Sequence, residues 1–185
     1  MYSQPRNTWV PYVLSRPMAF EPGTTFVYNT GASIMLQDML VNSLDMPLAE
    51  FNRTYYTNLV EGTASTNPSA VAMTPRDMAR MGQLFVNEGK WKNNQVVSPE
   101  WIERSVTPEF IAASSSGGDY GYQWWSRDFS NGKHHAWMAQ GNGGQYVLVF
   151  KDLDLVVVST GGNFGSSDMF NIYRWIERYV LRAFE

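Results

Sequence analysis

The stretch Glu21-Pro22-Gly23-Thr24-Thr25-Phe26-Val27-Tyr28-Asn29-Thr30-Gly31 is the most informative part of the sequence. Pro22-Gly23 marks a turn, and apolar residues recur at helical spacing over 32–44. Tyr28 therefore lies in a loop at the entrance of an apolar helix, where its hydroxyl can project into a cleft. The residues also allow a purely structural interpretation, in which Tyr28 packs at the helix entrance and Asn29 or Thr30 caps the helix.

Residues 1–118 as a whole are expected to be mainly helical. Pro47 allows a second helix to begin and to run to about residue 56, and the small, polar residues of 57–72 favour a loop. Two further helices are predicted from one shared signal, a capping hydroxyl residue directly before a proline. They begin at Thr74-Pro75 and Ser98-Pro99 and end near Gly89 and Pro108.

Residues 119–185 have a different pattern. After a Ser/Gly-rich loop at 114–118, apolar segments predict about four antiparallel strands, at 120–126, 134–140, 145–151 and 155–160. A final amphipathic helix is expected over 168–184, capped by Ser166 or Ser167. Helices followed by a meander and a last helix predict an α+β fold, either a single domain over 1–185 or the C-terminal portion of a larger one.

The composition argues against several classes of protein. The chain has 185 residues, 44% of them hydrophobic and 17% charged, which is typical of a globular protein with a core. Its net charge of −3, without a basic run, gives no support for nucleic-acid binding. No apolar stretch approaches the roughly 20 residues that span a bilayer, and the first residues show no signal-peptide pattern. Cysteine is absent, which excludes disulfides, thiol catalysis and Cys-ligated zinc.

No cofactor and no metal site are predicted. The sequence contains no HExxH, Walker A or dinucleotide-binding motif. His134 and His135 are adjacent, so on a strand they point to opposite faces and cannot chelate one metal together. Asp152 and Asp154 flank a tight hairpin connection, which favours turn chemistry over a pair of acid–base carboxylates.

Four separated segments together resemble class C β-lactamases and the related esterases and D-alanyl-D-alanine carboxypeptidases of the penicillin-binding type. The match follows the family's order and covers most of 17–162. The segments are Pro22-Gly23-Thr24-Thr25-Phe26-Val27-Tyr28, Met73-Thr74-Pro75-Arg76-Asp77, Tyr120-Gly121-Tyr122-Gln123-Trp124-Trp125 and Ala139-Gln140-Gly141-Asn142-Gly143-Gly144-Gln145. The resemblance implies a β-lactamase/transpeptidase-like fold that is incomplete at the N-terminus, and it suggests a periplasmic or secreted location.

The resemblance also implies roles for individual residues. In this family a serine attacks an ester or amide carbonyl, and a tyrosine helps to move the proton; Tyr28 would take that catalytic role. Two backbone N–H groups hold the oxyanion, and the strand position that supplies one of them corresponds to Gln145. The substrate-binding residues implied are Thr30, Asn142, Gly143, Gly144 and Gln145. Asn142 supplies no charge, which favours an esterase-like or altered site over penicillin recognition.

The family's Ser-x-x-Lys nucleophile has no counterpart at the expected place. The sole match is Ser130-Asn131-Gly132-Lys133, and Asn131-Gly132 is a hairpin-turn dipeptide. We therefore expect a hydrolase portion that is inactive alone and acts on a small ester or amide once completed. A non-catalytic binding module that keeps the cleft is the alternative, and self-association through an exposed sheet edge is a third possibility.

Overall fold

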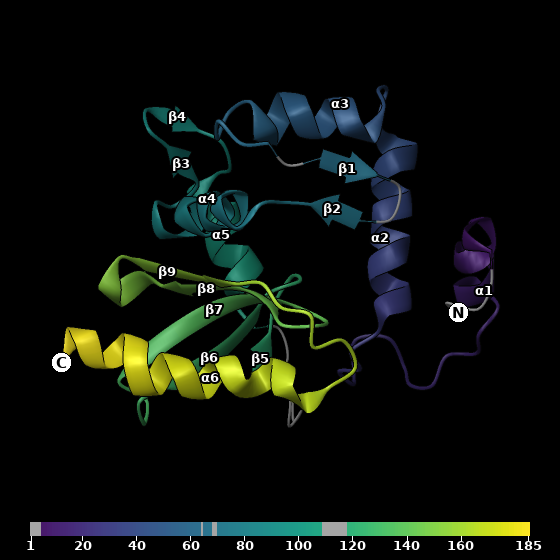
Figure 1. Cartoon of the computed structure of the whole chain (residues 1–185). Coiled ribbons are helices and arrows are strands. Elements are labelled where there is room, and N and C mark those ends of the chain that lie inside the picture. Colours follow the sequence, from purple (N-terminus) through teal and green to yellow (C-terminus); the bar gives the residue numbers. More distant parts are fainter. Residues whose placement is uncertain (1–4, 64, 68–69, 109–117) are drawn as a thin grey trace.

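The computed structural model describes residues 5–63, 65–67, 70–108 and 118–185, so the loop predicted at 114–118 lies outside the described residues except for Gly118. The strand residues pair as an antiparallel meander in the order β5-β6-β7-β8-β9, which confirms the predicted α+β class (Figure 1). The strands span Asp119–Tyr120, Trp125–Phe129, His134–Gly141, Gln145–Phe150 and Leu155–Ser159.

The sheet has a buried core on each face because its strands carry large apolar side chains on both sides. On one face, Phe129, Met138 and Leu148 pack against the C-terminal helical segment. On the other face, Val147 and Val149 pack with Trp124 and with apolar side chains of α4 (Pro75–Val86). Figure 1 shows the C-terminal helix below the sheet, and α4 and α5 (Pro99–Val106) above it.

Two predicted elements of this half differ in detail. The segment predicted as one strand at 120–126 is split into β5 and β6 by a turn at Gly121–Trp124, so the sheet has five strands and not about four. The final helix, capped by Ser166 as predicted, changes its winding along its length. It runs as a 3-10 turn, α6 (Asn171–Trp175), a π turn and a last 3-10 turn.

The first half is helical, as predicted. Helix α1 spans Trp9–Leu14 and α2 spans Thr30–Ser43. Helix α3 (Leu48–Asn52) continues as a π turn, and the two segments together cover the helix predicted from Pro47. The loop expected at 57–72 contains a short hairpin, because β1 and β2 pair there as Ser65–Asn67 with Ala70–Ala72. A second short hairpin, β3 with β4, pairs Lys90–Trp91 with Asn94–Gln95.

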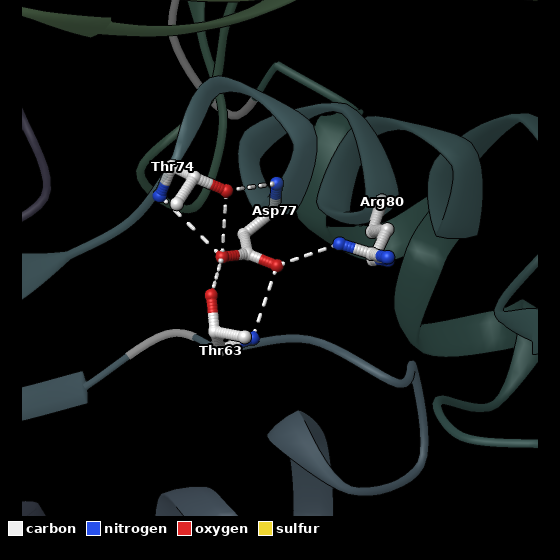
Figure 2. Close-up of polar contacts among 4 residues, drawn as sticks. All are labelled: Thr63, Thr74, Asp77 and Arg80. Carbon is white, nitrogen blue, oxygen red and sulfur yellow. Dashed lines mark hydrogen bonds and ion pairs between the residues drawn. The ribbon is translucent and has the colours of Figure 1, made fainter.

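The start of α4 is held by a network of hydrogen bonds around Asp77, called the Asp77 anchor below. Thr74 and Asp77 form a reciprocal capping box, in which each side chain accepts from the backbone N–H of the other. The Asp77 carboxylate also accepts from the Thr63 hydroxyl and N–H, at 2.7 and 3.1 Å, and pairs with Arg80 at 2.8 Å (Figure 2). Burial raises the pKa of Asp77, but the hydrogen bonds from Thr63 and Thr74 outweigh it and bring the value to about 2.

In the described ranges, no helix is both long and apolar enough to cross a membrane. No group of three or more His, Cys, Asp or Glu side chains gathers there in a way that could hold a metal ion.

Candidate active site

Tyr28 lies where the sequence places it, in the loop before α2. Asn29 caps the helix by accepting from the Gly31 N–H at 2.8 Å, and Thr30 is the first helical residue, exposed to solvent. The cap fixes the backbone next to Tyr28, whose residue surface stays 53% exposed. The structural and the functional interpretation of this stretch are therefore compatible, because the cap belongs to Asn29 and leaves the Tyr28 side chain available.

The Tyr28 ring packs on two aromatic residues of the sheet. Its centroid lies 5.9 Å from that of Tyr120, edge-on, and 5.5 Å from that of Trp125. Burial, followed by the nearby Tyr28 phenol, raises the pKa of Tyr120 to about 12. Tyr120 therefore stays protonated at physiological pH and acts here as a neutral ring.

The second predicted segment forms the turn between β7 and β8. Gly143 and Gly144 have φ of 88° and 99°, which glycine adopts without strain. A Cβ atom on Gly143 would lie 2.6 Å from the exposed Phe164 ring, which would have to move to admit a side chain. The Gly143 carbonyl accepts from the Asn163 N–H at 3.0 Å, which pairs this turn with the segment after β9.

Asn142 and Gln145 bind the same neighbouring segment. The side-chain Oδ1 of Asn142 accepts from the Gly165 N–H at 3.1 Å, and the side-chain Nε2 of Gln145 donates to the Gly161 carbonyl at 2.5 Å. Both side chains thus hold the segment after β9 in place, a role that the sequence did not predict. The Asn142 amide nitrogen has no described partner and is exposed, so it remains able to donate to a substrate carboxylate or carbonyl.

A largely apolar groove of about 680 Å³ lies between the first turns of α4 and strands β7 and β8. Three methionines form its α4 side, and Gln140 and Gln145 contribute polar groups from the sheet. The lining residues are Ala72, Met73, Met78, Met81, Ala139, Gln140, Gly141, Gln145, Val147 and Thr160. One of the predicted substrate-binding residues, Gln145, therefore faces a concave surface of ligand-site size.

The structure does not bring all predicted residues into one contact network. Tyr28 contacts Trp125, which belongs to the core on the α6 face, whereas the groove opens on the α4 face. Tyr28 and Thr30 are not among the groove residues. The Gly-rich turn with Gln145 and the Tyr28 loop are thus two separate parts of a candidate site.

Ser130 and Lys133 lie in a surface turn, as the sequence predicts. Ser130 and Asn131 have φ of 51° and 57°, so the pair is not on a helix, and the Lys133 N–H donates to the Ser130 carbonyl at 3.3 Å. The turn borders a polar pocket with Glu177 and Arg182, which shares no lining residue with the groove. This geometry lacks the single helix face that would direct serine and lysine into one cleft.

The two histidines separate to opposite faces of β7, also as predicted. His134 is buried, with Nδ1 2.6 Å from an Asp152 carboxylate oxygen, and His135 is exposed, 2.7 Å from Asp128. Asp152 therefore pairs with a histidine and lies in the hairpin connection, while Asp154 adopts a left-handed conformation there. Neither aspartate pairs with the other as an acid–base couple would.

Comparison with known proteins supports the fold. No protein-family model matches the sequence, and no curated protein matches it. Among solved structures, the chain is similar to a proposed 6-aminohexanoate-dimer hydrolase from Bacillus anthracis, with a TM-score of 0.71 and 23% identity over 90% of this chain. It is also similar to a proposed β-lactamase from Bacteroides dorei DSM 17855, with a TM-score of 0.65 and 17% identity over 88% of this chain.

These likenesses place the chain in the class of β-lactamase-fold proteins, which confirms the predicted resemblance at the level of the fold. The chain spans 47% and 58% of the two similar structures, so it corresponds to about half of each.

Proposed function

We propose that the chain forms the Tyr28 loop and the Gly-rich strand of an acyl-transferring serine hydrolase, and that the serine comes from a Ser-x-x-Lys segment outside these residues. One observation carries the proposal: the Gly-rich β7–β8 turn presents Gln145 at the rim of an apolar groove. Gly143 and Gly144 are themselves buried against the segment after β9, so Gln145 is the residue of this turn region that borders the groove.

In the completed site, the residues of this chain would share the work of acyl transfer. The Gln145 N–H would donate to the oxyanion that forms when the serine attacks the carbonyl carbon. Tyr28 would hydrogen-bond the serine hydroxyl; as a phenolate it would accept the serine proton and return it to the leaving group, and as a neutral phenol it would orient the serine while a base of the completing segment takes the proton. Thr30 and the exposed amide of Asn142 would hold the polar part of the substrate.

The names of the two similar structures give limited support for one substrate class, a compound with an amide bond. A 6-aminohexanoate dimer and a β-lactam both contain an amide bond, and the two similar structures carry names that refer to these compounds. Asn142 offers hydrogen bonds and no positive charge, unlike the lysine or histidine often found at that position. We therefore propose a small ester or a neutral amide as the substrate, in preference to a penicillin carboxylate.

The proposal predicts that the chain alone forms no acyl-enzyme. Incubation with a fluorophosphonate and with a fluorescent penicillin, read by intact mass, should leave the mass unchanged. Ser130→Ala serves as the matched control. A stoichiometric adduct that disappears in Ser130→Ala would overturn the proposal, because it would place the nucleophile in the 130–133 turn.

The second part of the proposal, that a completed site is active, is tested with a longer polypeptide that joins an in-frame Ser-x-x-Lys segment to this chain. It should be acylated on that serine, and Tyr28→Phe should slow acylation by about 10²–10⁴-fold, as removal of a proton-transfer group does. Tyr55→Phe is a suitable control, because Tyr55 is a tyrosine of equal exposure, 53%, on the turn after α3. Equal rates for the two variants would remove Tyr28 from catalysis.

A non-catalytic binding module is favoured instead if the coding sequence upstream of Met1 contains no Ser-x-x-Lys. The observation in its favour is the position of the sole Ser-x-x-Lys match in a surface turn. Such a module would use the groove for binding and would show no dependence of affinity on Tyr28→Phe.

We also propose that the edge of β9 takes part in self-association. This strand ends the sheet, carries Leu155, three valines and a serine, and contains no charge or proline that would protect an edge. Light scattering over a range of protein concentrations should show assemblies larger than the monomer. A monomer at all concentrations would contradict this part of the proposal.

A further inference from the structure

The residues beneath Tyr28 form an ordered aromatic cluster. Phe26 and Trp125 contact each other at a centroid distance of 6.2 Å, and Tyr120 lies 5.3 Å from Phe26 and 4.6 Å from Trp125. Phe26 and Tyr120 pack against the core on the α6 face, and Trp125 is buried within it. Three rings are therefore fixed in place before Tyr28 is added.

Tyr28 packs on the solvent-facing side of this cluster. Its ring meets Tyr120 at an interplanar angle of 90° and Trp125 at 32°, while about half of the residue stays exposed. Burial alone gives little reason for such a placement, because Phe26, two residues earlier, already fills the core position. Two contacts of different angle restrict the ring in orientation as well as in position.

The turn that carries these rings is itself held under constraint. Gln123 has a φ of 65°, which is uncommon for a residue with a side chain. The Tyr122 N–H donates to the Ser105 carbonyl at 2.8 Å, and the Gly121 N–H donates to the Trp124 carbonyl at 2.8 Å. A Cβ atom on Gly121 would lie 2.4 Å from the Ser105 carbonyl oxygen, so the turn lies directly on the end of α5.

The same turn reaches across to the helix that follows Tyr28. The Ser33 hydroxyl in the first turn of α2 donates to the Gln123 side-chain carbonyl at 3.0 Å. The Tyr28 loop is thus fixed to the turn on both sides, by Phe26 before it and Ser33 after it. Helix α2 packs mainly on α1, and not on the sheet.

We propose that Tyr120, Trp125 and Gln123 are positioning residues, which hold the Tyr28 ring in one orientation at the end of the sheet. The inference rests on the proposed function for its purpose, since an oriented phenol is what proton transfer to a serine requires. The orientation itself is a property of this chain and can be measured without activity.

The test uses the chain labelled with 3-fluorotyrosine and observed by fluorine NMR. The Tyr28 resonance is the one that disappears in Tyr28→Phe. It should be displaced from the position of free 3-fluorotyrosine in the unmodified chain, and Tyr120→Leu should move it to that position and sharpen it. Tyr120→Phe keeps the ring and should restore the original resonance.

A neighbouring tyrosine provides the matched control. Tyr122 lies in the same turn, but its ring packs on Trp101 at 5.8 Å and on Arg104. Tyr122→Leu should therefore leave the Tyr28 resonance in place. If Tyr120→Leu also collapses the resonances of the buried Tyr146, it has unfolded the chain, and Gln123→Ala and Ser33→Ala then replace it; each should shift Tyr28 toward the free position.

Two results would overturn the inference. One is a Tyr28 resonance already at the free position in the unmodified chain. The other is a Tyr28 resonance unchanged in a folded Tyr120→Leu variant, or unchanged in both Gln123→Ala and Ser33→Ala. Either failure is distinct from failure of the proposed function, which is read from acylation of a completed site and not from the order of Tyr28.

Discussion

The sheet and helix α2 both carry several large apolar side chains, but only those of the sheet are mostly buried. In the sheet, Phe150 is fully buried in the core on the α6 face. In α2, Leu36 and Met39 remain 54% and 63% exposed, and Gly31 is the sole buried residue. Large apolar side chains on a helix are normally packed against other elements. The difference teaches that α4, α5 and the C-terminal helical segment close the core of the sheet, whereas α2 leaves large apolar side chains exposed.

The strongest test of this difference pairs one substitution from each region. Phe150→Ala should lower the free energy of unfolding by about 3–5 kcal/mol, because it removes a fully buried ring and leaves a cavity. Leu36→Ala, on the exposed side of α2, should change it by no more than about 0.5 kcal/mol. Urea denaturation monitored by Trp fluorescence measures both. Similar losses for the two variants would show that α2 is as well packed as the sheet.

The sequence predicted the sheet better than α2 for a physical reason. Strand segments such as 145–150 are filled with β-branched and aromatic residues, and both faces are covered by helices within the same chain, so local pattern and tertiary context agree. The groups that surround the candidate site depend on longer-range contacts. Gln123 reaches Ser33 across 90 residues, and no local pattern indicates such a contact.

The candidate site shows the same division. Tyr28 in its loop and the glycines at 143 and 144 follow from turn chemistry and were predicted from local sequence. The packing of Tyr28 on Tyr120 and Trp125 was not predicted, because these two residues were expected on one continuous strand. Residues 121–124 form a turn instead. Gly121 lies against the Ser105 carbonyl, where a side chain on residue 121 would clash.

A second prediction concerns the Asp77 anchor, which joins the chain before β1 to α4. The pKa of Asp77 in the folded chain, about 2, is below its ordinary value of 3.8, so its contribution is present above pH 4 and is lost as the pH falls toward 2. The shift corresponds to about 2 kcal/mol. Acid titration of unfolding should show this loss, and Asp77→Asn should remove it.

The control for this prediction is a carboxylate of similar type outside the network. Asp38 on α2 contacts Asn42 at 3.0 Å and is exposed. Asp38→Asn should leave the acid profile of unfolding unchanged. An acid profile that is equally steep in Asp77→Asn and in the unmodified chain would contradict the assignment of the anchor.

The smallest expected effect compares two helix caps. Ser98 caps α5 by accepting from the Trp101 N–H at 3.2 Å, and Asn29 caps α2 by accepting from the Gly31 N–H at 2.8 Å. Ser98→Ala should cost about 1 kcal/mol, because α5 unfolds with the sheet on which it lies. Asn29→Ala should cost less in global unfolding, since a weakly packed α2 can open locally first. Chemical denaturation with both variants decides this, and a larger loss for Asn29→Ala would reverse the order.

Hydrogen exchange of the backbone amides tests the central difference most directly. The account predicts that amides of β7 and β8 exchange only through global unfolding, whereas those of α2 exchange much faster through local opening. Protection of α2 equal to that of β8, in the chain as a monomer, would contradict the account. It would mean that α2 needs no further partner.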